Sequence, residues 1–142
     1  VVLVVSLILS GCAGPQRTES PYELGSGHSG LSVADSRHDI TLEQIRSHVQ
    51  NMTAVLVDAR TPQQFESGHL RGAINVPAGQ IEAFVGQIED NVSAGELIII
   101  YCESASCGSG IMVYEDLATK GYTNMRVFSP GWQMLASAKD LQ

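Results

Sequence analysis

Cysteine, basic residues and aromatic residues are all scarce in this chain of 142 residues. Three cysteines are too few for the disulfide framework of a small secreted domain. The eight lysines and arginines form no cluster, and 15 acidic residues bring the formal net charge to −7, which argues against a nucleic-acid partner. The four histidines are scattered and none has metal-site spacing to a cysteine, so we expect no bound metal and no cofactor.

Long hydrophobic runs are also lacking, since the apolar stretch from Val1 to Leu9 is too short to span a bilayer. Its length suits the h-region of a secretory signal peptide. Leu9-Ser10-Gly11-Cys12 follows it and resembles a bacterial lipobox, in which the chain is cut before the cysteine and the thiol carries a diacylglycerol. We therefore expect residues 1–12 to be a lipoprotein signal with lipidation at Cys12. A truncated transmembrane helix, or an ordinary signal peptide with a chance cysteine, is the alternative.

This N-terminus predicts an exported protein that is lipid-anchored to the bacterial cell envelope through Cys12. Ala13 follows the cysteine in place of aspartate, which favours the outer membrane, facing the periplasm, in a Gram-negative host. The chain begins without methionine or a basic segment, so we expect further residues before Val1. Residues 13–38 are rich in glycine, serine and charged residues without a hydrophobic period, which predicts a flexible linker.

Short apolar runs alternate with helical patterns from residue 39 to residue 142. The predicted strands are Val55–Ala59, Ala73–Val76, Leu97–Tyr101 and Met125–Phe128. Thr41 and Thr61 are candidate N-caps of the first two helices. Strands and helices that alternate at this spacing predict one α/β domain, with a mainly parallel sheet covered on both faces.

The predicted strand that ends at Tyr101 leads directly into a small-residue loop that begins at Cys102 and closes at Cys107. A strand end, a tight loop and a helix start direct several backbone N–H groups to one point, so we expect the thiolate of Cys102 to be stabilised there. The pKa of that thiol would then fall below its ordinary value of about 8.5. Asp58 ends a neighbouring predicted strand and should lie near Cys102. A buried, inert cysteine is the alternative.

Three ordered segments of this chain resemble the rhodanese-like domain family, from about residue 39 to residue 137. They are Leu56–Pro62 with the residues up to Pro77, Ile99–Cys102 with its loop, and Gly121–Val127 with Gly131-Trp132. The resemblance implies a three-layer α/β/α sandwich around a five-stranded parallel sheet. It also implies a sulfurtransferase that carries sulfane sulfur as a cysteine persulfide.

The same resemblance assigns roles to particular residues. It makes Cys102 the catalytic residue and Asp58 and Arg60 supporting residues, with an ion pair between Arg60 and Glu66. The remaining loop positions are Glu103, Ser104, Ala105, Ser106 and Gly108. Cys107 stands where the family often has arginine, so it is either a resolving thiol or a small residue that shapes the loop.

The loop departs from the family in its charge. Glu103 replaces a basic residue, and no lysine or arginine lies between Cys102 and Cys107. Thiosulfate is a dianion that would lose a charged hydrogen bond of roughly 1.5–3 kcal/mol in this loop. We therefore expect thiosulfate to be a poor donor, and the same absence argues against phosphatase chemistry.

The preferred prediction is a sulfurtransferase that takes sulfur from a small donor and passes it to a thiol acceptor, including a protein thiol. A dithiol redox or sensor module that uses Cys102 and Cys107 is the first alternative. A non-catalytic binding domain on the same fold is the second. A monomer is the default expectation.

Overall fold

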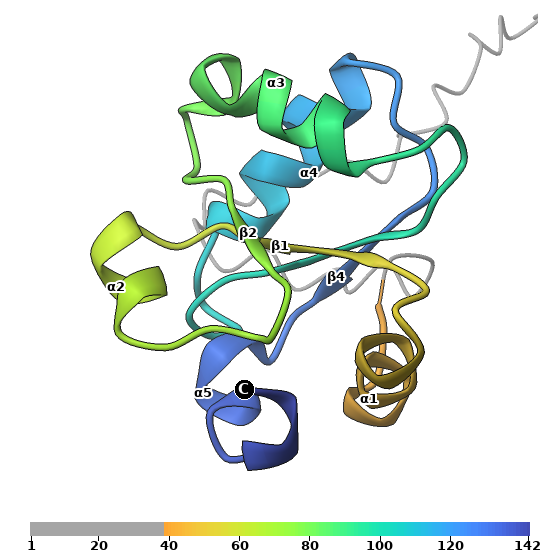
Figure 1. The fold of residues 1–142 in the computed structure, drawn as a ribbon. Coiled ribbons are helices and arrows are strands. Elements are labelled where there is room, and N and C mark those ends of the chain that lie inside the picture. The colour runs from red at the N-terminus through yellow and green to blue at the C-terminus, as the bar shows by residue number, and fades with distance from the viewer. Residues whose placement is uncertain (1–38) are drawn as a thin grey trace, which may run out of the picture. The chain divides into compact units, whose positions relative to one another are not determined.

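The computed structural model describes residues 39–142, in which helices lie on both sides of a central sheet (Figure 1). The elements in chain order are α1 (Leu42–Asn51), β1 (Val55–Asp58), α2 (Pro62–Glu66), β2 (Ile74–Asn75), α3 (Ile81–Asn91), β3 (Ile98–Tyr101), α4 (Ser109–Thr119), β4 (Met125–Phe128), α5 (Gly131–Leu135) and the short 3-10 helix η1 (Lys139–Leu141). The signal, linker and Cys12 predictions lie outside these residues. Within residues 39–142, no helix has the length and apolar character needed to cross a membrane.

The four strands form one parallel sheet in the order β2-β1-β3-β4. This confirms the predicted α/β sandwich, with four strands in place of five. Beyond β4, Asp39 forms a single parallel bridge with Val127 at the edge where a fifth strand would pair. That pairing stops after one residue because Thr41 already caps α1.

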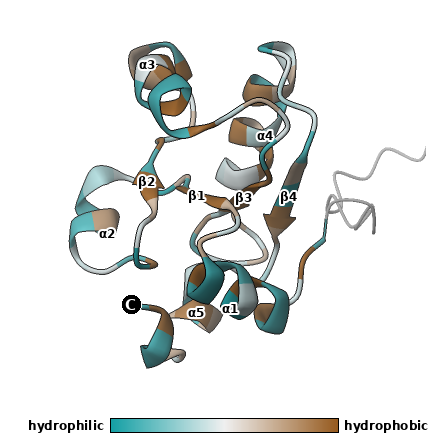
Figure 2. Ribbon diagram, turned by 45° about the vertical axis from the view of Figure 1, so that its right-hand side comes forward, coloured by the Kyte–Doolittle hydropathy of each residue, from teal (hydrophilic) through white to brown (hydrophobic). Residues whose placement is uncertain are grey.

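The sheet buries a separate apolar layer on each face, because successive side chains along a strand point to opposite sides. On one side, Leu56 and Ile99 pack with residues of α1 and α5. On the other side, Val57 and Ile100 pack with residues of α3 and α4. The hydrophobic colour is concentrated in the strands, between the helical layers (Figure 2). Both faces of the central strands are therefore covered, as their continuous apolar sequences require.

The predicted starts of the first two helices are confirmed by their capping hydrogen bonds. The Thr41 hydroxyl accepts from the backbone N–H of Gln44, whose side chain accepts in return from the N–H of Thr41. Thr61 and Gln64 form the same reciprocal pair at α2, where Pro62 occupies the first helical position. This second cap fixes the segment that follows β1 at the carboxyl edge of the sheet.

Candidate active site

The loop from Cys102 to Gly108 connects the end of β3 to the start of α4 at the carboxyl edge of the sheet. Cys102 is only 4% exposed, and its sulfur lies 3.1 Å from the carbonyl oxygen of Cys107 and 3.6 Å from that of Ser104. The backbone N–H groups of Ser104 and Gly110 also point at this sulfur. The loop therefore holds the Cys102 sulfur in a cup of backbone groups that contains both donors and acceptors.

The first turn of α5 donates two hydrogen bonds to the first residues of this loop. The backbone N–H of Trp132 donates to the carbonyl of Cys102 at 2.7 Å, and that of Gln133 donates to the carbonyl of Glu103 at 3.0 Å. Gly131 has a φ of 69°, and a β-carbon at this position would lie 2.6 Å from the Cys102 carbonyl oxygen. Only glycine fits this approach. The sequence placed Gly131 in a family segment but gave no indication that it supports the loop.

Asp58 and Arg60 form a buried ion pair at the end of β1, beside the loop. The Arg60 guanidinium donates to both carboxylate oxygens of Asp58 through Nε, at 3.0 and 3.1 Å, and through Nη2 at 2.7 Å. Its Nη1 lies 3.4 Å from the carboxylate of Glu103. Burial alone lowers the pKa of Arg60, but the hydrogen bonds and charge of Asp58 raise it above its ordinary value. Arg60 is therefore a fixed cation between two carboxylates.

The partner that the resemblance implied for Arg60 is wrong. Arg60 pairs with Asp58 and Glu103, and its side chain also donates to the carbonyl of Gly68 at 2.7 Å. Its guanidinium carbon lies 4.5 Å from the centre of the Trp132 ring, so the cation stacks on an aromatic face. Glu66 lies at the far end of α2 and takes no part in this cluster. Asp58 lies two residues before Arg60, and its planar carboxylate accepts hydrogen bonds from Nε and Nη2 of the planar guanidinium.

The predicted proximity of Asp58 and the cysteine loop is confirmed, but the connection is indirect. Asp58 is the register partner of Tyr101, the residue before Cys102. Its carboxylate reaches the loop through Arg60, because Arg60 also contacts Glu103. The side chain of Asn75 fixes the end of β1 by donating to the carbonyls of Asp58 and Arg60. The sequence did not indicate this role for Asn75.

The ionisation expected for Cys102 is wrong for the reduced thiol. Burial raises the pKa of Cys102 to about 12, and a hydrogen bond to Cys107 acts in the same direction. The N–H groups of Gly110 and Ser104 lower this pKa but do not overcome burial. The sequence correctly placed donors around the sulfur, but it could not show that the sulfur would also lie out of contact with water.

Cys107 is the more acidic thiol of the pair. Burial alone raises its pKa, but hydrogen bonds from the Cys102 thiol and from Ser109, together with the backbone N–H of Glu103, lower it to about 7. Cys107 is partly exposed, whereas Cys102 is buried. The Cys102 thiol donates to the carbonyl of Cys107, and Cys107 is the thiol of the two that ionises more readily.

A cleft of about 220 Å³ opens beside the loop, between the segments that follow β1, β2 and β3. Its lining includes Arg60, Gln64, Glu103 and Cys107, and it does not include Cys102. The side chain of Gln64 donates to the carboxylate of Glu103 at 3.2 Å across this cleft. The arrangement can present a thiolate to a small molecule, next to one guanidinium and one carboxylate.

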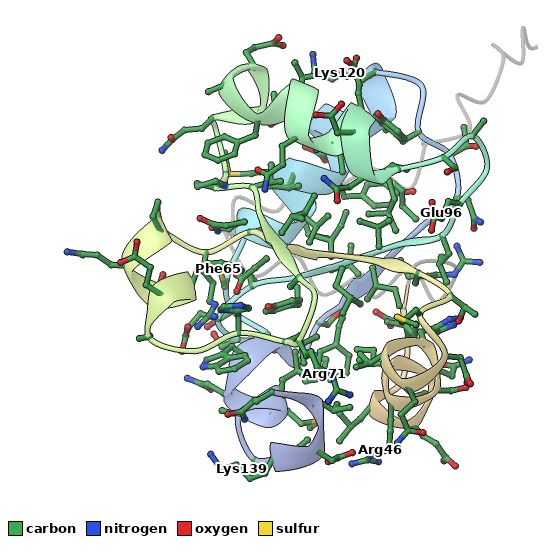
Figure 3. The ribbon with its side chains drawn as sticks, in the orientation of Figure 1. Arg46, Phe65, Arg71, Glu96, Lys120 and Lys139 are labelled. Atoms are coloured by element: carbon green, nitrogen blue, oxygen red, sulfur yellow. The ribbon has the colours of Figure 1, made fainter. Side chains whose placement is uncertain are left out.

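His69 and Phe65 lie beside this region but serve the fold. Nδ1 of His69 lies 2.8 Å from the carbonyl oxygen of Phe65, and the two rings are stacked with centres 3.7 Å apart. Phe65 lies at the end of the sheet opposite Glu96 (Figure 3). Within residues 39–142, no group of three or more histidine, cysteine or acidic side chains is placed to hold a metal ion.

Comparison with known proteins matches residues 41–138 to the rhodanese-like domain. Thiosulfate sulfurtransferase 16 of Arabidopsis thaliana is 32% identical over 88 residues, which cover 56% of this chain and 72% of that protein. The uncharacterized protein YqhL of Bacillus subtilis is 30% identical over 46% of this chain and 48% of its own length. The match to this second relative therefore spans about half of that protein.

Solved structures show the same fold at lower identity. A human single-domain sulfurtransferase superimposes with a TM-score of 0.58 and 19% identity, over 71% of this chain and 96% of that one. A protein from Lactobacillus plantarum gives a TM-score of 0.62 at 17% identity, over 73% and 85% of the two chains. These two likenesses establish the architecture alone.

Proposed function

The chain belongs to the rhodanese-like domain family, and on that premise we propose that it is a sulfurtransferase that carries sulfane sulfur as a persulfide on Cys102. One observation carries the proposal: the Cys102 sulfur lies at the carboxyl edge of the sheet, with the backbone N–H groups of Ser104 and Gly110 directed at it. A persulfide is a stronger acid than a thiol, so these donors would stabilise the anion that forms once sulfur is bound. The reduced Cys102 thiol, in contrast, stays protonated and is shielded from solvent.

The charge of the site supports an organic persulfide or polysulfide as the donor, and not thiosulfate. The buried cation of Arg60 is already shared by Asp58 and Glu103, so these three groups carry a net negative charge. A dianion in the cleft would meet the Glu103 carboxylate without a free guanidinium to bind it. A thiol or protein thiol serves as the acceptor in this proposal.

The test is mass spectrometry of the reduced chain after exposure to a polysulfide donor. The wild type should gain one sulfur atom that is removed by a thiol acceptor, and the Cys102→Ser chain should fail to pass sulfur to that acceptor. A reduced wild type that gains no sulfur at any donor concentration contradicts the proposal. The Cys12→Ser chain is the matched control, since it removes a cysteine outside the rhodanese-like region.

A dithiol redox module is the second candidate, and the contact of the Cys102 thiol with the backbone of Cys107, the other free thiol of the loop, favours it. Oxidation by glutathione disulfide would form one bond between the two sulfurs and release two molecules of glutathione. Alkylation trapping across a series of glutathione ratios should then show both thiols lost together. Thiols that are labelled independently at every ratio exclude this candidate.

For location and partners, we propose attachment to the bacterial envelope through a lipid on Cys12, where a small sulfur donor and a thiol acceptor meet the domain. The support is the sequence Leu9-Ser10-Gly11-Cys12 after an apolar run. Incorporation of labelled palmitate into the chain expressed in bacteria tests the anchor. Label that persists in the Cys12→Ala chain contradicts it.

A further inference from the structure

The two loop thiols differ in what a molecule in the cleft can reach. Cys107 lines the cleft of about 220 Å³, together with Arg60 and Glu103. Cys102 does not line it and is only 4% exposed, beneath the carbonyls of Cys107 and Ser104. A donor that enters this cleft therefore meets the sulfur of Cys107 before it meets that of Cys102.

We propose that Cys107 is the entry nucleophile, which takes the sulfane sulfur from the donor and then transfers it to Cys102. This inference rests on the proposed function, because it adds a step before the persulfide forms on Cys102. It changes Cys107 from a resolving thiol, which acts after Cys102, into the first thiol to react.

The surroundings of Cys107 suit an attacking thiol. Its pKa of about 7 lies close to neutral pH, where an attacking thiol combines a large thiolate fraction with good nucleophilicity. The groups that face it are the Cys102 thiol, Ser109 and the N–H of Glu103, and the charged side chains of its cleft are Arg60 and Glu103. The neighbouring Cys102, with a pKa of about 12, is almost fully protonated at the same pH.

In the first step, the Cys107 thiolate attacks the outer sulfur of an organic persulfide, RSSH. A bond forms between that sulfur and Cys107, the S–S bond of the donor breaks, and its electron pair leaves with RS⁻. The new Cys107 persulfide keeps the proton of the donor, so its outer sulfur remains an electrophile for the next step. No oxidant or reductant is consumed, because the sulfane sulfur keeps its oxidation state.

In the second step, the sulfur of Cys102 attacks the outer sulfur of the Cys107 persulfide. A new S–S bond forms on Cys102, the bond to Cys107 breaks, and the proton of the Cys102 thiol moves to the Cys107 sulfur. The Cys102 thiol already donates to the carbonyl oxygen of Cys107 at 3.1 Å, so its proton lies close to the residue that receives it. The product is a Cys102 persulfide, which releases its proton to water and becomes an anion that the N–H groups of Ser104 and Gly110 stabilise.

The experiment measures sulfur uptake by the full reduced chain in a Cys12→Ser background, with L-cysteine persulfide as the donor. Rapid quenching with an alkylating agent and mass spectrometry give the initial rate of sulfur gain. We expect the Cys102→Ser chain still to gain one sulfur, held on Cys107, and the Cys107→Ser chain to be slower than the parent by tenfold or more. Any smaller slowing in Cys107→Ser, or a Cys102→Ser chain that gains no sulfur, overturns the inference.

A pH profile of the parent chain gives a second test that needs no change in the loop. The initial rate should rise through a midpoint near pH 7 and then level off, as the Cys107 thiolate becomes fully populated. A rate that continues to rise above pH 9 identifies Cys102 as the entry thiol and overturns the inference. A parent chain that gains no sulfur at any pH refutes the proposed function itself, whereas sulfur gain at the parent rate in Cys107→Ser refutes only the entry role.

Discussion

The two ends of the parallel sheet carry cavities of very different character. The amino end holds the larger hollow, about 350 Å³, between the turns at residues 92–96 and 120–124. The carboxyl end holds the smaller cleft of about 220 Å³, beside a buried ion pair and two free thiols. The ion pair beside the larger hollow joins a partly exposed Lys120 to a mostly exposed Glu82. The buried charges and free thiols therefore lie beside the smaller cleft, so cavity volume alone does not single out the candidate site.

The difference has a simple structural origin. At the amino end the connections are short turns, in which Gly95 and Gly121 adopt positive φ and the side chain of Asn124 donates to the carbonyl of Gly95. At the carboxyl end the segments after β1 and β3 must turn into helices, which brings backbone groups and polar side chains together. Changes at the two ends should consequently have unequal effects on stability and on sulfur transfer.

The largest effect should come from Arg60→Ala, which leaves the Asp58 carboxylate buried without its partner. Removing one member of a buried ion pair costs about 3–5 kcal/mol, and we expect the free energy of unfolding to fall by that amount. Urea denaturation followed by circular dichroism measures it. Arg60→Lys is the matched control, since it keeps the charge but loses the paired hydrogen bonds, and it should lose less stability. A loss below about 1 kcal/mol in Arg60→Ala would show that Asp58 is not dependent on this cation.

Gly131→Ala should have the next largest effect. A β-carbon there would overlap the Cys102 carbonyl at 2.6 Å and would also occupy a left-handed φ, so we expect a loss of more than about 1–2 kcal/mol and slower sulfur uptake. Gly95→Ala is the control at the amino end, because it has a φ of 79° with open space around the new methyl group. This control should lose about 1–2 kcal/mol from the backbone alone and keep full sulfur uptake. Equal loss of uptake in both variants would remove the special role of Gly131.

Glu103→Arg should raise the preference for thiosulfate over cysteine persulfide as the sulfur donor by about tenfold. The substitution replaces a carboxylate in the cleft with a guanidinium, and one charged hydrogen bond is worth roughly 1.5–3 kcal/mol. We expect kcat/KM for thiosulfate to rise relative to that for cysteine persulfide, as measured by release of sulfite and of cysteine. Glu82→Arg, on α3, is the control for a change of net charge. An equal rise in Glu82→Arg would mean that overall charge, and not the cleft, decides donor choice.

Lys120→Gln at the amino end should have the smallest effect. The ion pair with Glu82 is exposed to water, so its loss should change the free energy of unfolding by less than about 1 kcal/mol. The rate of sulfur uptake should be unchanged, because Lys120 lies at the opposite end of the sheet from the loop (Figure 3). A clear fall in sulfur uptake in this variant would place the larger hollow in the reaction and break the contrast between the two ends.

Local sequence patterns predicted the elements of this domain well. The strands, the N-caps Thr41 and Thr61 and the helix after the cysteine loop were all predicted from runs of a few residues. The fifth strand was implied by the family resemblance alone, and a single bridge at Asp39 stands in its place. Patterns of this kind are readable because they reflect hydrogen bonds between residues close along the chain.

The sequence predicted which residues gather at the site, but not all of the contacts between them. Cys102 and Asp58 were correctly assigned to one edge of the sheet, because parallel strands end there together, whereas the family resemblance named Arg60. The contact of Arg60 with Glu103, and the support of the loop by Gly131, depend on how segments up to 43 residues apart meet in space. No local pattern encodes those distances.

The sequence by itself determined that an apolar strand would deliver a cysteine to a polar loop, with a second cysteine five residues later. Only the tertiary structure decided that the first sulfur would lie under carbonyl oxygens while the second would line a cleft. The physical reason is that the pKa of a thiol depends on its access to water and on the groups around it, and both are set when the loop packs against α5 and the end of β1.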